Sequence, residues 1–254
     1  MIDPGARTLF LKEVRRFFRV WGQTVISPII TTALYLLVFG YALGGRLRTV
    51  HGIPYLDFIV PGLIMLGLVS NAFLNTSSSV IIMKMQGTLV DILVTPLSHR
   101  QIAGAMIGAA ALRGLIVGAC TWGVALFAQT RIALPHPLYA FAFPVLSAVL
   151  LAALGLLTGI WAEKIEQVNF FPTFVLTPLT FLGGVFYDVH TLPQPFSFLS
   201  QLNPVLYLVE GMRYGMLGRS STDPVLGLAI LTALTVGAVW ACVAVIRTGW
   251  KLRS

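Results

Sequence analysis

Charged residues are scarce in this 254-residue chain: only 10% are Asp, Glu, Lys or Arg, against about 25% in an average soluble domain. Hydrophobic residues make up 57%, which excludes an ordinary soluble fold and predicts an all-α integral membrane protein. Cysteine is also rare. Cys120 and Cys242 both lie inside apolar stretches without nearby Cys or His, which excludes a disulfide framework and a cysteine-based metal site.

Motifs for catalysis and nucleotide binding are missing as well. The sequence has no Gly-Lys dipeptide, hence no Walker A loop for phosphates, and no G-x-S-x-G or H-E-x-x-H motif. Its four histidines, at positions 51, 99, 136 and 190, are scattered and pair with no acid at a catalytic spacing. We therefore expect no catalytic residue, no metal site and no cofactor bound by this chain.

Long apolar stretches, by contrast, are frequent. Six of them are nearly free of charge over the roughly 17 to 25 residues that a transmembrane helix needs. They predict spans at about 24–45, 58–82, 108–130, 138–161, 168–187 and 225–246. The first lacks an A-x-A-like cleavage site, so we expect a retained span and one transmembrane domain over residues 1–254.

The basic residues predict the orientation. The net charge of +8 comes without a dense basic run or a basic-aromatic surface, so we expect no nucleic-acid partner and apply the positive-inside rule. With both termini cytoplasmic, twelve of the 17 basic residues are inside: Arg7, Lys12, Arg15, Arg16, Arg19, Lys84, Arg100, Arg113, Lys164, Arg247, Lys251 and Arg253. Five are outside: Arg46, Arg48, Arg131, Arg213 and Arg219. The expected topology is N-in, C-in.

Residues 7–21 predict an amphipathic helix before the first span. One helical face gathers apolar side chains, namely Phe10, Val14, Phe17, Phe18 and Trp21, while most basic residues lie elsewhere. Such a helix suits the surface of the inner leaflet and its lipids. The alternative is a cytoplasmic extension of the first span.

Arg113 interrupts the third apolar stretch. An arginine within a membrane is by default a functional hypothesis. The alternative is that Gly114 to Thr130 forms the span, with Arg113 and Arg131 each at an interface. Glycine pairs spaced i, i+4, at 104 and 108, 114 and 118, and 155 and 159, predict close helix packing.

The stretch from 168 to 218 carries the strongest functional signal. A span is broken at Gly183-Gly184 and is followed by Val205 to Leu217, whose 13 residues would rise about 20 Å as a helix, against about 30 Å of hydrocarbon. A segment that enters lipid without crossing is usually tied to a transport pathway. Its Glu210 and Arg213 are spaced to pair on one helical face; alternatively, Arg213 meets lipid headgroups.

Two polar stripes lie within predicted spans. Asn71, Asn75 and Ser78 follow Gly67 at helical spacing in the second span, and Thr173, Thr177 and Thr180 precede Gly184 in the fifth. Both stripes are candidates for lining a substrate route. The alternative is hydrogen bonding between helices or to each helix's own backbone.

The cytoplasmic loop at 84–101 has an apolar centre, Leu89 to Leu93, around Asp91. It predicts a short helix ended by Thr95-Pro96, because a residue before proline disfavours helical dihedrals. Such a helix suits docking to another subunit, although a plain interfacial loop fits equally. Residues 161–167 form a second elbow.

These parts together resemble the ABC-2 type transporter permeases, the membrane subunits of bacterial ATP-driven exporters. The specific motif is Gly183-Gly184, then Leu192-Pro193, then Asn203-Pro204-x-x-Tyr207, then Arg213. The loop TLVDILVTPLSHRQI also matches, although many relatives carry an acidic pair where this chain has Val90-Asp91.

The resemblance implies a homodimer in the bacterial inner membrane, bound to two copies of a separate ATP-binding subunit that uses ATP and Mg. It implies ATPase-coupling residues, namely Thr88, Leu89, Asp91, Leu93, Thr95, Pro96, Glu163 and Lys164. It also implies an external re-entrant region at 188–218 and an external gate, formed by Gly183, Gly184, Leu192, Pro193, Asn203, Pro204, Tyr207, Glu210 and Arg213. The second and fifth spans would flank the route.

Two other function classes compete with an exporter permease. A self-sufficient channel or ion-coupled carrier would show acids in the membrane or an inverted repeat, and an integral-membrane enzyme would show a convergent polar site. The sequence has neither feature. Its uncharged stripes favour an amphipathic or lipid-like cargo.

Overall fold

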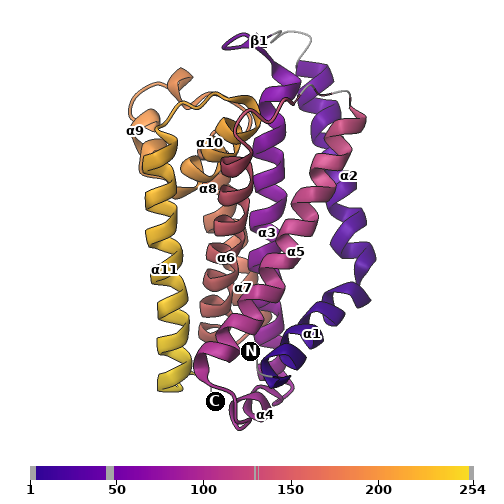
Figure 1. Ribbon diagram of the computed structural model, residues 1–254, viewed down its shortest axis with the longest axis vertical. Helices are drawn as coiled ribbons and strands as arrows, with labels where there is room; N and C mark the ends of the chain where they lie inside the picture. Colours follow the sequence, from indigo (N-terminus) through magenta and orange to yellow (C-terminus); the bar gives the residue numbers. More distant parts are fainter. Residues whose placement is uncertain (1–3, 44–48, 129, 131, 252–254) are drawn as a thin grey trace.

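The computed structural model describes residues 4–43, 49–128, 130 and 132–251. They form a bundle of long helices with a β hairpin at one end, whose two strands have two residues each (Figure 1). Positions 44, 45 and 129, at the ends of two predicted spans, lie outside these residues. The same is true of Arg46, Arg48 and Arg131, which the charge count assigns to the outer side.

The elements of the first half are α1 (Pro4–Arg19), the π-helical turn η1 (Gly22–Ile26), α2 (Ser27–Tyr35), the π-helical η2 (Leu36–Leu43), β1 (Thr49–Val50), β2 (Ile53–Pro54), α3 (Tyr55–Met85), α4 (Leu89–Leu93) and α5 (His99–Phe127). Those of the second half are α6 (Pro137–Trp161), α7 (Ile165–Phe171), the π-helical η3 (Pro172–Leu176), α8 (Thr177–Leu182), the 3₁₀ turn η4 (Val189–Thr191), α9 (Phe196–Gln201), α10 (Pro204–Leu217) and α11 (Pro224–Thr248).

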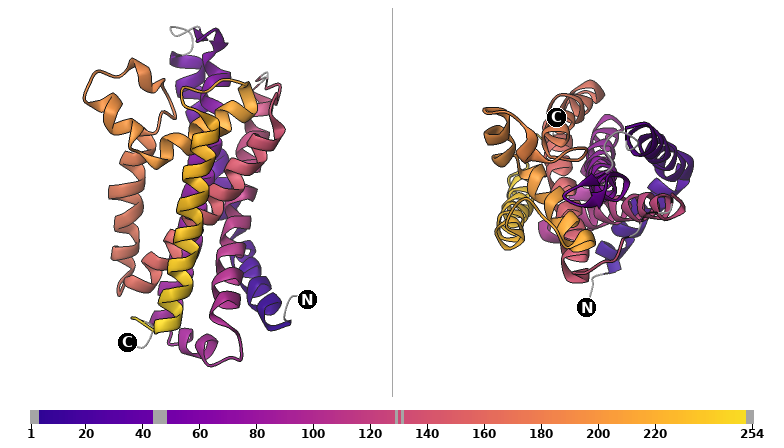
Figure 2. Two further views of the ribbon diagram at one scale, coloured as in Figure 1. Left: turned by 60° about the vertical axis from the view of Figure 1, so that its left-hand side comes forward. Right: turned by 90° about the horizontal axis from the view of Figure 1, so that it is seen from above.

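Helix α3 is the centre of the bundle and contacts α5, α6 and α10 (Figure 2). Its core side chains include Ile59, Val60 and Phe73, which are fully buried. Close approach of α6 to α3 requires glycine, because a Cβ at Gly155 would lie 2.3 Å from the carbonyl oxygen of Phe73. Gly155 and Gly159 therefore pack as predicted, whereas the prediction of close packing is wrong for Gly104, where an added Cβ would meet no atom within 4 Å.

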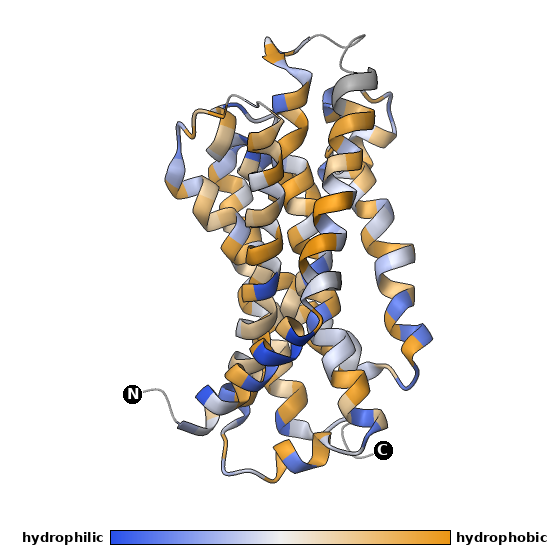
Figure 3. Ribbon diagram, turned by 90° about the vertical axis from the view of Figure 1, so that its right-hand side faces the viewer, coloured by the Kyte–Doolittle hydropathy of each residue, from blue (hydrophilic) through white to orange (hydrophobic). Residues whose placement is uncertain are grey.

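Among the described residues, four helices are long and apolar enough to cross a membrane: α3, α5, α6 and α11. A fifth candidate is a bent pair, in which Pro4–Arg19 and Thr24–Phe39 meet at 79°. Figure 3 shows that hydrophobic residues dominate the long helices and that hydrophilic ones are frequent in α1 and near the end with both termini. The protein is thus an all-α membrane protein with four or five such candidates, where the sequence predicted six spans.

The difference from six arises in the first and fifth predicted spans, which are interrupted helices. Residues 168–187 divide into α7, η3 and α8, and the helix ends at Leu182, before Gly183. Pro172 begins η3 and Pro178 is the second residue of α8, and each lacks the N–H that would continue the α-helical pattern. Residues 24–43 are likewise divided among η1, α2 and η2.

Helix α1 packs along α5 at the end of the bundle that carries both termini (Figure 1). The predicted range of 7–21 becomes Pro4–Arg19, with Leu9, Glu13 and Phe17 buried. Phe18 and Trp21, which the sequence placed on the same apolar face, are 49% and 59% exposed. The predicted amphipathic helix is therefore present, and part of its apolar side faces away from the protein.

The contact at Gly155 leads to a stability prediction. We expect Gly155→Val to lower the thermal stability of the protein in detergent, because the α3 backbone must move away from the added side chain. Overpacking of this kind costs on the order of 1 to 3 kcal/mol or more. Gly237→Val in α11 is the control, since no atom lies within 4 Å of its added Cβ. Equal melting temperatures for both variants would contradict the close packing of α6 on α3.

Candidate functional site

The broken span and the short helix after it are joined by Asn203. Its side-chain amide donates a hydrogen bond to the Leu179 carbonyl in α8 (2.6 Å), and its Oδ1 accepts one from the Val205 N–H (2.9 Å), which caps α10. Gly184 has a φ of +70°, a left-handed conformation that favours glycine and turns the chain after α8. The double glycine therefore ends the helix, as the sequence predicted, and α10 begins against it.

An ion pair between Glu210 and Arg213 fixes α10 inside the protein. Both residues are buried, with exposed fractions of 0% and 2%. Arg213 also donates to the Gly184 carbonyl (2.8 Å), and its guanidinium lies 3.9 Å from the centre of the Phe58 ring on α3. The alternative that Arg213 meets lipid headgroups does not fit this burial.

The second carboxylate oxygen of Glu210 holds the loop that follows α10. It accepts hydrogen bonds from the Ser221 N–H (2.6 Å) and from the Ser220 hydroxyl (3.2 Å). Glu210 thus pairs with Arg213 of the same helix through one oxygen and holds the segment before α11 through the other.

Asp188 connects three loops at the same end. It bonds His51 in the β hairpin, the His190 N–H (3.0 Å) and the Ser221 hydroxyl (3.2 Å). Burial alone would raise the pKa of this carboxyl, but these hydrogen bonds outweigh burial and lower the pKa below its usual value. The carboxylate is therefore ionised at neutral pH. This cluster could not be read from the sequence, because His51 lies 137 residues from Asp188.

Most predicted external-gate residues meet in this region, and three lie beside it. Gly183, Gly184, Asn203, Pro204, Glu210 and Arg213 surround the junction of α8 and α10. Leu192 and Pro193 lie in the loop between η4 and α9, and Pro193 is exposed. The Tyr207 hydroxyl donates to the Gln201 carbonyl (2.9 Å) and so connects α10 to α9.

A second polar network, at the opposite end of α3, contains the asparagines of the predicted stripe. Arg113 on α5 donates to the Oδ1 atoms of Asn75 (3.2 Å) and Asn71 (3.3 Å), and Arg16 on α1 donates to the Asn75 Oδ1 and carbonyl. Arg113 therefore extends into a protein network and is not a free interfacial charge. Within the described residues, the Ser78 hydroxyl bonds its own helix alone, through the Asn75 carbonyl.

Glu13 is the member of this network that sequence reasoning missed. It is 2% exposed, and one of its carboxylate oxygens accepts hydrogen bonds from Arg16 (3.0 Å) and from the Ser79 hydroxyl on α3 (2.7 Å). The available signal was that Glu13 is the one acid among the basic residues of 7–21. Within the described part of the chain, no partner reaches its other oxygen or the Nε of Arg113, although both atoms are buried.

The threonine stripe bonds mostly to its own helix. The Thr177 hydroxyl donates to the Pro172 carbonyl (2.9 Å), and that of Thr180 donates to the Thr177 carbonyl (2.8 Å). Thr173 and Thr177 are exposed, whereas Thr180 is buried.

Members of both stripes line two neighbouring cavities on one side of α3. A cavity of about 260 Å³ between α2 and α3 reaches Asn71, and one of about 230 Å³ between α3 and α8 reaches Thr177 and Thr180. Tyr35 and Ser70 line both cavities. Hydroxyl groups and apolar side chains are mixed along this side of α3.

The predicted coupling loop contains one helical turn, α4, at the end that carries both termini (Figure 1). Leu89 and Ile92 are buried against the bundle, while Val90, Asp91 and Val94 are exposed. The helix ends before Thr95-Pro96 as predicted; Thr95 and Pro96 are exposed, and Thr88 and Leu93 are half-buried.

The second elbow lies against the end of α11. Lys251 donates to Glu163 (2.8 Å), and this hydrogen bond lowers the pKa of the exposed Glu163 carboxyl. Lys164 is exposed. Among the described residues, no three His, Cys, Asp or Glu side chains gather in a way that would hold a metal ion.

The buried ion pair leads to a second prediction. Arg213→Gln leaves Glu210 as an unpaired buried charge, and breaking such a pair costs about 3 to 5 kcal/mol. We therefore expect a lower melting temperature in detergent. The double variant Glu210→Gln with Arg213→Gln leaves no unpaired charge and should recover part of the loss. Equal stability of the single variant and the unchanged protein would contradict a pair that holds α10.

Comparison with known proteins identifies relatives of this chain. Residues 5–217 match the family described as ABC-2 type transporter. The chain is 38% identical to the inner membrane transport permease YadH of Escherichia coli (strain K12) over 252 residues, 98% of this chain and 96% of the relative. It is 29% identical to nodulation protein J of Sinorhizobium fredii over 231 residues, 87% of this chain and 86% of that protein.

These matches extend over nearly the whole sequence and include both the short helix α10 and the loop with α4. They agree with the long apolar helices of the structure. Membrane proteins of this family associate with an ATP-binding subunit. The protein is therefore a transport permease with several membrane helices in a bacterial inner membrane, and it belongs to the ABC-2 type transporter family.

Proposed function

We propose that this chain is the permease subunit of an ABC exporter, which forms the substrate route and couples it to a separate ATP-binding subunit. Two copies of the permease would form a homodimer that binds two copies of the ATPase, which uses ATP and Mg. The single observation that carries this proposal is α4, a helical turn at the end with both termini (Figure 1), in which Asp91 is exposed and after which Val94 is exposed.

The proposed topology has six spans with both termini in the cytoplasm. They are the interrupted segment of η1, α2 and η2, then α3, α5, α6, the interrupted segment of α7, η3 and α8, and finally α11. The position of both chain ends at one end of the bundle supports this arrangement (Figure 1). The angle of 79° between α1 and the next helical segment supports an α1 that lies along the inner leaflet.

The proposed coupling contact is the outer face of α4. Leu89 and Ile92 anchor it to the bundle, so a displacement of α4 by the ATPase would reach α3, which α4 contacts. The Glu163 elbow would be a smaller contact, because Glu163 already pairs with Lys251.

The proposed route follows the side of α3 that carries the two cavities. Asn71, Thr177 and Thr180 contribute to their walls together with aromatic and aliphatic side chains. If this side of α3 faces the same side of a second copy, the cavities of the two copies would join into one path. Their mixed polar and apolar lining supports an amphipathic cargo.

The proposed gate is α10, re-entrant from the outer side. Its 14 residues rise about 21 Å, less than the hydrocarbon core of about 30 Å. The contacts of Asn203 and Arg213 with α8 would hold it across the outer end of the route. A self-sufficient channel, the alternative function, would need neither α4 nor an ATPase.

The coupling proposal is tested by co-purification with the ATP-binding subunit. We expect Asp91→Lys and Val94→Asp to reduce the amount of ATPase bound by about tenfold or more, as for a contact near the centre of an interface. Gln194→Lys is the control, because it alters an exposed residue at the other end of the molecule. An unchanged complex in both α4 variants would exclude α4 as the docking element, and a chain that transports without an ATPase would support the channel.

The topology is tested by labelling whole cells with a membrane-impermeant maleimide. In a variant without Cys120 and Cys242, a single cysteine introduced by Gln194→Cys should react, because we place it outside. One introduced by Val94→Cys should react only after the cells are opened. The reverse pattern would mean that the protein has the opposite orientation.

A further inference from the structure

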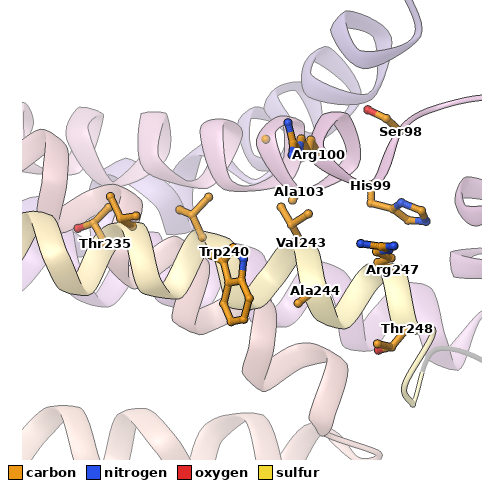
Figure 4. A pocket seen from close by; sticks show the side chains of 13 residues that line it. Ser98, His99, Arg100, Ala103, Thr235, Trp240, Val243, Ala244, Arg247 and Thr248 are labelled. Atoms are coloured by element: carbon orange, nitrogen blue, oxygen red, sulfur yellow. The ribbon is translucent and has the colours of Figure 1, made fainter.

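A groove separates the start of α5 from the last turns of α11, on a side of the bundle that the proposed route does not use (Figure 4). Its volume is about 1070 Å³. The α5 wall includes Arg100 and Gly104, and the α11 wall extends from Thr235 to Thr248.

The walls of the groove are apolar over most of its length. Val236, Val239, Trp240 and Val243 lie on one face of α11, because they are spaced by three or four residues or are adjacent. Val236 and Trp240 are 63% and 72% exposed. From Thr235 to Arg247 the helix rises about 18 Å, slightly more than the roughly 15 Å of one leaflet's hydrocarbon. The groove therefore has the length of one acyl chain.

One end of the groove is basic. Figure 4 shows His99 and Arg247 at that end, and Arg100 farther along the groove at the level of Ala103; both arginines are exposed. No acidic residue lines the groove, and among the described residues no hydrogen bond or ion pair engages either guanidinium. Two unneutralised cations near the end of an apolar channel complement a negatively charged headgroup above a hydrocarbon chain.

A second copy of this chain fits the groove less well. In a two-fold dimer with its axis along the membrane normal, residues at equal depth face each other, so Arg247 would approach Arg247 of the second copy. Like charges in such an interface repel, and the lining offers no acid to separate them. The charge pattern thus favours a lipid over a protein partner.

We infer that the groove between α5 and α11 binds one anionic phospholipid, with its phosphate at Arg100 and Arg247 and an acyl chain along Trp240. The arginine N–H groups would donate to the phosphate oxygens, and the amino-terminal end of α5 adds a favourable dipole. Assignment to the inner leaflet rests on the proposed orientation. The bound lipid is a structural partner of the permease, separate from its cargo.

Tryptophan fluorescence tests the inference directly. In full-length protein that keeps Trp240 and carries Phe at the other four tryptophan positions, bromine on an acyl chain quenches Trp240 when that lipid occupies the groove. Vesicles would contain equal fractions of brominated phosphatidylglycerol or of brominated phosphatidylcholine in unbrominated phosphatidylcholine. We expect quenching to reach half of its maximum at a fraction on the order of tenfold lower for phosphatidylglycerol, from two basic contacts.

Two matched pairs of variants separate the groove from general effects. Arg100→Gln with Arg247→Gln should remove the preference, whereas Arg7→Gln with Lys164→Gln, an equal charge change at exposed sites outside the groove, should keep it. Gly104→Leu should also remove the preference, because its added Cβ meets no atom within 4 Å and fills the groove without a clash. Gly123→Leu, a second open glycine of α5 outside the groove, should keep it.

Several results would overturn the inference. Equal quenching by both lipids means that only bulk lipid touches Trp240, and no quenching by either means that protein covers α11. A preference that survives Gly104→Leu, or that is lost equally in Gly123→Leu, contradicts binding in the groove. The experiment contains no ATPase, so its outcome does not depend on the coupling proposal. A reversed orientation would change the leaflet in which the lipid binds, but not the preference for phosphatidylglycerol.

Discussion

The buried ion pair between Glu210 and Arg213 is the interaction on which the end of the bundle opposite both termini depends. Charged side chains that are fully buried cannot be solvated by water, so protein groups must pair with them. Arg213 reaches the Gly184 carbonyl at the end of α8 and the Phe58 ring on α3, while Glu210 holds the chain before α11. Three segments distant in sequence are thereby held around α10.

The opposite end of α3 repeats this arrangement with different side chains. Glu13 and Arg16 of α1 and Arg113 of α5 meet Asn75 and Ser79, so that charged groups from two helices share polar groups of a third. Helix α3 therefore meets one charged cluster at Phe58 and another from Asn71 to Ser79, and its residues that line the two cavities, from Leu63 to Leu74, lie mostly between them. This placement explains why a mainly apolar central helix retains asparagines and serines.

The positions of most helices could be predicted from the sequence. The contacts between them could not, because they depend on which helical faces meet. The lengths of the apolar stretches predicted α3, α5, α6 and α11, and the spacing of Glu210 and Arg213 predicted their pairing. Glu13 was missed because one acid among basic residues resembles a solvated charge. Arg113 stayed ambiguous because sequence does not tell whether a helix end faces lipid or another helix. The groove depends on Arg100 and Arg247, which only the fold brings to the same groove.

The π-helical turns η1, η2 and η3 interrupt the helical segments beside the cavities, whereas the central helices α3 and α6 have no such turn. Each occurs in a peripheral segment, before or after α2 or before α8. By contrast, α3 and α6 are continuous helices, and they pack closely at Gly155. A π turn accommodates an extra residue, so a helix can turn about its axis there with little loss of hydrogen bonding. The two cavities therefore lie between a continuous central helix, α3, and interrupted segments, so their shape can change through movement of the interrupted segments alone.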